Sequence, residues 1–162
     1  MNRFVLVCLL LLSRPGVQAS QSGGIQFFTG SWQQALAEAR RQHKPIFLDI
    51  YAHWCPPCQR MAREALPSPV VGAAYNDRFI NYQLDAEVGE GLSLARQYGI
   101  ASYPTALFLT PDGQLIHRGV GYAGVNGMVQ QANLVLRMPA MRRALRKRPA
   151  VTSLADTLRT SP

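Results

Sequence analysis

The pattern of apolar and polar residues alternates along the chain between segments with helical periodicity and segments typical of β-strands. Ser31 is a suitable N-cap for a helix whose apolar residues Trp32, Leu36 and Ala39 share one face. Residues 45–52 are almost continuously apolar, which is typical of a strand buried on both faces. The pattern predicts helices over residues 31–42, 92–98 and 125–136, a helix after residue 55, a short helical turn over 70–75, and strands over 45–52, 79–84, 105–109 and 114–120.

The order of these elements predicts an α/β fold. Strands and helices alternate in the first part of the chain, which favours parallel strands joined by helical crossovers. The last two strands are separated only by a short turn at Pro111-Asp112-Gly113, which favours an antiparallel hairpin. We therefore expect a mixed central β-sheet flanked by helices.

The segment Cys55-Pro56-Pro57-Cys58 carries the most specific chemistry of the chain. It follows Trp54 at the end of the apolar run and precedes a helical pattern. Two thiols at this spacing can close a small disulfide ring. A cysteine at a helix N-terminus also gains from free N–H groups and from the helix dipole, which favour its thiolate. The segment thus predicts thiol–disulfide exchange, with Cys55 more exposed than Cys58.

The N-terminus has the pattern of a secretory signal peptide. Arg3 precedes nine apolar residues, and Val17-Gln18-Ala19 supplies the small residues of a cleavage site. Nine residues are too few for a membrane-spanning helix, which needs about 20. We expect residues 1–19 to be removed, together with Cys8, so that both remaining cysteines belong to the motif. A lipid on Cys8 is the alternative, and it is disfavoured because the leucine run follows Cys8.

Basic residues concentrate outside the expected core. Residues 20–136 contain eight basic and eight acidic side chains, which disfavours a nucleic-acid-binding role for this stretch. We divide the chain into the signal, a linker over residues 20–30, a domain over residues 31–136, and a basic C-terminal extension over residues 137–162. The extension is expected to be solvated, or alternatively to contact an anionic lipid surface or an acidic partner.

The motif and the element order together resemble the thioredoxin superfamily. The segment from Asp49 to Cys58 is similar to its active-site segment, and Tyr103-Pro104-Thr105 is similar to its cis-proline loop. Within the superfamily, the chain looks most like the secreted C-terminal domain of the transmembrane thiol:disulfide interchange reductase and its free-standing relatives. One departure concerns the lysine that the family often carries near the buried aspartate, because Asn81 or Gln83 falls in that region.

The resemblance implies a role for each residue of the site. Cys55 would be the nucleophile, Cys58 the resolving thiol, and Asp49 a buried acid that exchanges a proton with Cys58. Pro104 would follow a cis peptide bond, and with Trp54 and Tyr103 it would contact the substrate. The resemblance thus implies three catalytic residues, Cys55, Cys58 and Asp49, and three substrate-binding residues, Trp54, Tyr103 and Pro104.

The expected function is that of a periplasmic thiol–disulfide oxidoreductase that reduces protein disulfides. It would need no cofactor beyond its own cysteines, and a membrane electron donor would restore its thiols. A dithiol oxidase or isomerase is one alternative. A metal- or client-binding module without turnover is the other, although His53 is the only nearby additional ligand and would leave a tetrahedral metal incomplete.

Overall fold

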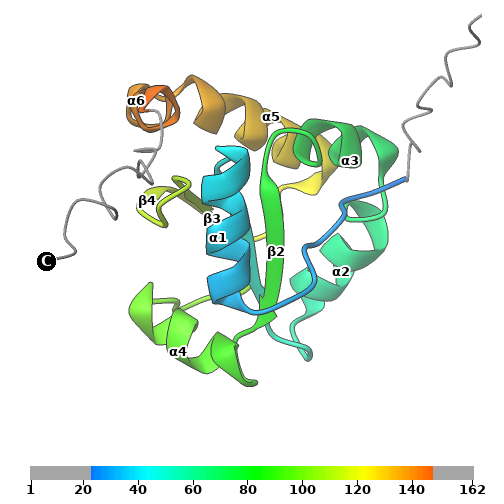
Figure 1. Cartoon of the computed structure of the whole chain (residues 1–162). Coiled ribbons are helices and arrows are strands. Elements are labelled where there is room, and N and C mark those ends of the chain that lie inside the picture. The colour runs from blue at the N-terminus through cyan, green and yellow to red at the C-terminus, as the bar shows by residue number, and fades with distance from the viewer. Residues whose placement is uncertain (1–22, 148–162) are drawn as a thin grey trace, which may run out of the picture.

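The computed structural model describes residues 23–147, and the predicted signal segment lies outside this range. Figure 1 shows a central sheet with helices on both sides. The elements in chain order are α1 (Trp32–Gln42), β1 (Ile46–Tyr51), α2 (Pro56–Glu64), α3 (Pro69–Tyr75), β2 (Ile80–Asp85), α4 (Glu90–Gln97), β3 (Thr105–Leu109), β4 (Leu115–Val120), α5 (Gly124–Arg137) and α6 (Pro139–Arg146). Among the described residues, no helix is both long enough and apolar enough to cross a bilayer.

The four strands form one mixed sheet in the order β2-β1-β3-β4. β1 pairs in parallel with β2 and antiparallel with β3, and β3 pairs antiparallel with β4. This topology agrees with the expected mixed sheet, including the hairpin between the last two strands. The central strand β1 ends at Tyr51, so the loop that leads to the two cysteines begins where this strand ends.

Alternate residues of β1 serve two separate cores. Ile46, Leu48 and Ile50 pack with α1 and α4 on one face of the sheet. Phe47 packs on the other face with residues of α2, α3, α5 and α6. Because side chains alternate along a strand, Asp49 lies on the same face as Phe47. This two-sided burial explains why the β1 sequence is almost continuously apolar.

Local sequence signals fix the ends of the helices that position the site. Ser31 caps α1 in a reciprocal capping box with Gln34. Cys55 is the N-cap of α2, and the two prolines of the motif occupy the first two helical positions. Proline is well suited to these positions because its fixed φ matches a helix and its missing N–H would have no partner within the helix.

The packed unit extends beyond the predicted domain of residues 31–136 at both ends. Before it, the backbone N–H of Ile25 donates to Leu66 O at 2.7 Å and that of Phe28 to Asn81 O at 2.7 Å, so residues 25–28 are not a free linker. After it, residues 139–146 form α6, and Met141 is fully buried. Met138, Met141 and Leu145 are therefore enough to pack the basic segment against the core. Residues 148–162 lie outside the described range.

Candidate active site

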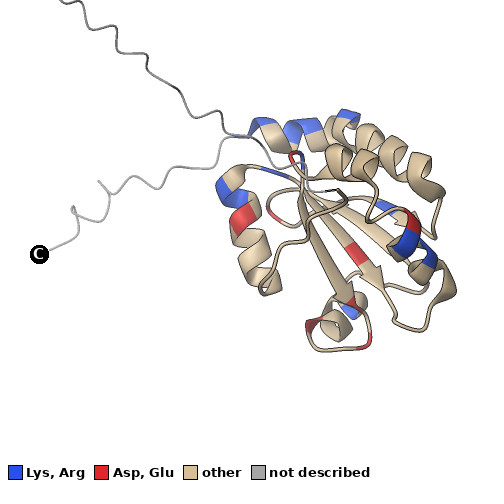
Figure 2. Ribbon diagram, turned by 90° about the vertical axis from the view of Figure 1, so that its right-hand side faces the viewer, with Lys and Arg blue, Asp and Glu red and all other residues tan. Residues whose placement is uncertain are grey.

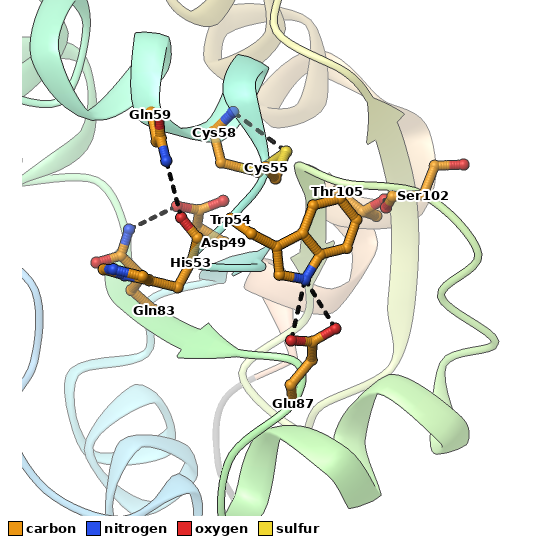
Figure 3. The surroundings of a disulfide bond; sticks show 10 residues. All are labelled: Asp49, His53, Trp54, Cys55, Cys58, Gln59, Gln83, Glu87, Ser102 and Thr105. Atoms are coloured by element: carbon orange, nitrogen blue, oxygen red, sulfur yellow. Dashed lines mark hydrogen bonds between the residues drawn. A yellow bond between two sulfur atoms is a disulfide. The ribbon is translucent and has the colours of Figure 1, made fainter.

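The two cysteines form a disulfide at the N-terminus of α2, with their Cα atoms 5.3 Å apart (Figure 3). The Cys55 Sγ accepts a hydrogen bond from the backbone N–H of Cys58 at 3.3 Å. Pro56 and Pro57 have no N–H, so the Cys58 N–H is the first one that the helix offers to this sulfur. One amide donor and the helix dipole would therefore support a thiolate at Cys55.

Both cysteines are buried in the disulfide form, which differs from the expected exposure of Cys55. Cys55 is 3% exposed and Cys58 is 5% exposed. The ring that joins the sulfurs makes each residue cover the other, and Ala52 and Tyr103 pack against the pair. Exposure is thus similar for the two cysteines in this state, and what distinguishes Cys55 is its place at the N-cap of α2.

Asp49 is a fully buried carboxyl on the central strand. Strand register places it opposite Gln83 of β2, whose side-chain N–H donates to Asp49 Oδ2 at 2.8 Å. Asp49 Oδ1 has no hydrogen-bond partner among the described residues. Burial raises the pKa of Asp49 to about 7, and the hydrogen bond from Gln83 opposes this shift. The carboxyl can therefore both release and accept a proton near neutral pH.

A cavity of about 420 Å³ connects this acid with the cysteine pair. Asp49, Cys58 and Gln83 all line it. The cavity is large enough for several water molecules and has polar groups to hold them. Asp49 also lines a second cavity of about 510 Å³, which reaches Pro104 and Gly121. The acid predicted from the sequence thus lies where it can exchange protons with Cys58 through solvent.

Trp54 forms an exposed rim beside the disulfide, with 62% of its surface accessible. Its indole N–H is 3.0 Å from each carboxylate oxygen of Glu87, which lies in the loop after β2 (Figure 3). Tyr103 meets the indole edge-on, with ring centroids 6.2 Å apart. Two loops therefore hold the ring in place. Sequence reasoning missed Glu87, because no local pattern links it to a tryptophan 33 positions earlier.

The loop before β3 completes the site. The Tyr103–Pro104 peptide bond is cis, and Pro104 is buried. The carbonyl of Pro104 accepts a hydrogen bond from the N–H of Gly121 at 2.8 Å, which ties this loop to the end of β4. Gly121 has φ +81°, a left-handed conformation that glycine adopts without strain. The fold thus brings all six predicted site residues to one end of the sheet.

The histidine and the possible metal ligands of this region add little to the site. His53 is exposed, and its backbone carbonyl accepts a hydrogen bond from the Gln59 side chain at 3.1 Å. Within residues 23–147, no group of three or more His, Cys, Asp or Glu side chains is placed to hold a metal ion. The chemistry that the described residues support is that of a dithiol–disulfide couple beside a buried acid.

Comparison with known proteins places this arrangement in a family. Residues 28–111, about half of the chain, match the family model described as thioredoxin-like. The thiol:disulfide interchange protein DsbD of Neisseria meningitidis is 28% identical over 116 residues, which cover 70% of this chain and 19% of DsbD. A thioredoxin-like protein of Synechocystis is 35% identical over 91 residues, which cover 54% of this chain and 78% of that protein.

A solved structure agrees with these sequence matches. The oxidised C-terminal domain of Neisseria meningitidis DsbD superposes with a TM-score of 0.55 at 26% identity, covering 68% of this chain and 97% of that domain. The chain itself spans about a fifth of the length of the DsbD protein of Neisseria meningitidis. With the sheet, the disulfide and the family match in agreement, the chain belongs to the thioredoxin-like family.

Proposed function

We propose that this thiol–disulfide oxidoreductase works as a reductase of protein disulfides in the periplasm. The observation that carries the proposal is the Cys55–Cys58 disulfide at a helix N-terminus, lining the same cavity as a buried acid. A disulfide of this sequence separation closes too short a loop to add much stability, so a chemical role accounts for it better. The signal-like residues 1–19 support export.

The reaction begins with the reduced protein. The Cys55 thiolate attacks one sulfur of a substrate disulfide, a mixed disulfide forms, and the other substrate sulfur leaves as a thiolate. Cys58 then loses its proton and attacks the Cys55 sulfur, which releases the second substrate thiolate. Two electrons pass from the protein to the substrate, and the protein is left with the Cys55–Cys58 disulfide seen in the structure. A membrane electron donor would reduce it again.

Asp49 acts as the base for the second step in this proposal. Cys58 must lose its proton while Cys55 is bound to the substrate, so a base near Cys58 is needed at this step. The Asp49 carboxyl, whose pKa is raised to about 7 by burial, can take up the Cys58 proton at neutral pH. Both residues line the cavity of about 420 Å³, which supplies the route. Asp49→Asn should therefore slow release from the mixed disulfide more than its formation in stopped-flow measurements.

Trp54, Tyr103 and Pro104 would form the surface on which the substrate lies. The indole is exposed and held in place, so it can cover an extended segment without a large loss of side-chain freedom. Partners of this surface are protein thiols and disulfides.

The equilibrium potential of the cysteine couple, measured against glutathione, tests the direction. A value near −270 mV, the thioredoxin range, supports reduction, whereas one near −120 mV would assign the protein to the oxidases and contradict the proposal. The two motif prolines favour the reducing side because they withhold two N–H donors from the thiolate. A Cys58→Ser variant should trap mixed disulfides with clients. If Cys58→Ser traps no mixed disulfide and the wild-type protein shows no disulfide-reducing turnover, the protein would be a binding module.

A further inference from the structure

A cluster of basic side chains lies on α6, apart from the cysteines. The segment from Arg137 to Lys147 has five basic residues and no acidic one. Arg142, Arg143, Arg146 and Lys147 are exposed. None of them forms an ion pair with another described residue, since the ion pairs found among residues 23–147 involve only Glu38, Asp112 and two arginines of α1. The charge of α6 is therefore available to a partner.

The apolar side of α6 faces inward and fixes this orientation. Met141 is fully buried, and Leu145 packs against the same core. The helix thus has no free apolar face to insert into a partner, and its exposed charges are all cations. Any attraction it exerts must be electrostatic and must weaken as salt is added.

The C-terminal end of α1 extends the charged surface. The His43 imidazole contacts the backbone carbonyl of Leu145, which places the end of α1 beside the end of α6. Lys44 follows directly, and Arg40 and Arg41 are exposed on the last turn of α1 although each is paired with an acid. We define the basic face as the exposed cations of α6 together with the basic residues at this end of α1, which are Arg142, Arg143, Arg146, Lys147, Arg40, Arg41 and Lys44.

The basic face and the redox site lie at opposite ends of the central strand. β1 begins at Ile46, two residues after Lys44, and ends at Tyr51, four residues before Cys55. Six strand residues span about 20 Å. In Figure 2, blue segments lie on the helices at the top and left and a loop with red segments lies at the bottom, while further blue segments lie at the right and beside that loop. A partner on the basic face would therefore leave Cys55 and Trp54 free.

We propose that the basic face docks the protein on a bilayer surface that contains anionic lipid. A small anion needs several donors that converge in a pocket, but each of the four cavities found among the described residues is lined by at most one residue of the basic face. The cations instead project outward from a helix, which suits a surface that presents many negative charges over a wide area. Without an apolar face for insertion, the contact is peripheral and reversible. The docked protein presents its disulfide away from the bilayer.

Vesicle sedimentation tests the proposal with residues 20–162. At low salt the protein should bind vesicles with 30% phosphatidylglycerol in phosphatidylcholine and not vesicles of phosphatidylcholine alone. A triple variant with Arg142→Gln, Arg143→Gln and Arg146→Gln should bind about 100-fold more weakly, since each cation near an anionic surface contributes about fivefold. Its thermal unfolding and its disulfide exchange rate should match the wild type, because these side chains touch neither the core nor the redox site.

The matched control removes the same charge elsewhere. Arg60→Gln, Arg63→Gln and Arg96→Gln change three exposed arginines of α2 and α4, and this variant should keep vesicle binding within about threefold of wild type. Equal losses in both variants would overturn the proposal, because net charge alone would then drive binding. So would protection of Trp54 from acrylamide on vesicles, which would place the redox end on the lipid. Binding to soluble polyglutamate without binding to anionic vesicles would assign the face to an acidic protein.

Discussion

Replacing Asp49 with asparagine should make the protein more stable at neutral pH, and by an amount that depends on pH. The carboxyl is fully buried, and burial raises its pKa from 3.8 to about 7. A group whose pKa is higher in the folded state favours folding most below its unfolded pKa, and that contribution is lost as pH rises toward the folded pKa. The loss therefore falls between about pH 4 and pH 7 and is complete above it.

The magnitude follows from the shift of about three pKa units. At 1.36 kcal/mol per unit, wild type loses about 4 kcal/mol relative to Asp49→Asn between pH 4 and pH 7. The asparagine brings a fixed cost of about 1–3 kcal/mol, because its amide group meets the position where Asp49 Oδ1 already has no partner. That cost is independent of pH. The difference in unfolding free energy between Asp49→Asn and wild type should therefore change by about 1.4 kcal/mol per pH unit, and this slope reports the carboxyl alone.

Urea unfolding of the oxidised protein at several pH values between 3.5 and 8 measures this difference. The disulfide form is chosen because its cysteines do not titrate. Asp77→Asn, at an exposed aspartate, is the matched control and should follow the wild-type pH profile. Parallel profiles for Asp49→Asn and wild type would refute the reasoning. They would mean that Asp49 is already ionised in the folded protein at acidic pH, and the proton exchange with Cys58 would lose its basis.

Three further predictions concern the neighbours of this acid and of the disulfide. Gln83→Leu removes the hydrogen bond that lowers the Asp49 pKa, so the pH window of the stability loss should extend to higher pH, and an unchanged window in urea unfolding would contradict this. Glu87→Ala should raise KM for a protein disulfide about 2- to 10-fold, because Trp54 loses its hydrogen-bond acceptor. Glu87→Gln keeps an acceptor, so its KM should stay close to that of wild type. Equal increases of KM in the two variants would assign the role of Glu87 to its charge. In the reduced protein, a small alkylating agent should label Cys55 first, and peptide mapping that finds its partner labelled faster would reverse the two roles.

The sequence predicted those parts of the fold that depend on short-range patterns. The cap at Ser31, the buried strand β1 and the position of Cys55 before α2 each follow from residues close together in the chain. The pairing of Asp49 with Gln83 depends instead on the register between two strands 34 positions apart. The sequence could place Gln83 only in the general region of the acid, because a slip of one residue would have turned its side chain to the other face.

The extent of the packed unit depends on contacts between segments that are distant in the sequence. Pro139 follows α5 and occupies the first turn of α6, where proline is favourable. The few apolar residues of that helix are spaced to face the core, and Met141 alone becomes fully buried. At the other end, Phe27 and Phe28 pack against the domain although they precede its first helix. Short apolar groups such as these become core only when a distant surface is available to receive them.

The energetic cost of Asp49 bears on whether its role is chemical or structural. At neutral pH, the buried carboxyl lowers the free energy of unfolding by about 4 kcal/mol. This is large for a domain whose total free energy of unfolding is of the order of 5–15 kcal/mol. Few hydrogen bonds offset this cost, because Asp49 Oδ2 accepts a hydrogen bond from Gln83 alone and Oδ1 has no partner among the described residues. A merely structural site would be better served by an apolar residue, which would pack with Phe47 at no such cost. A residue that weakens the fold and lines a cavity with Cys58 is therefore best explained by proton exchange, which an apolar side chain cannot perform.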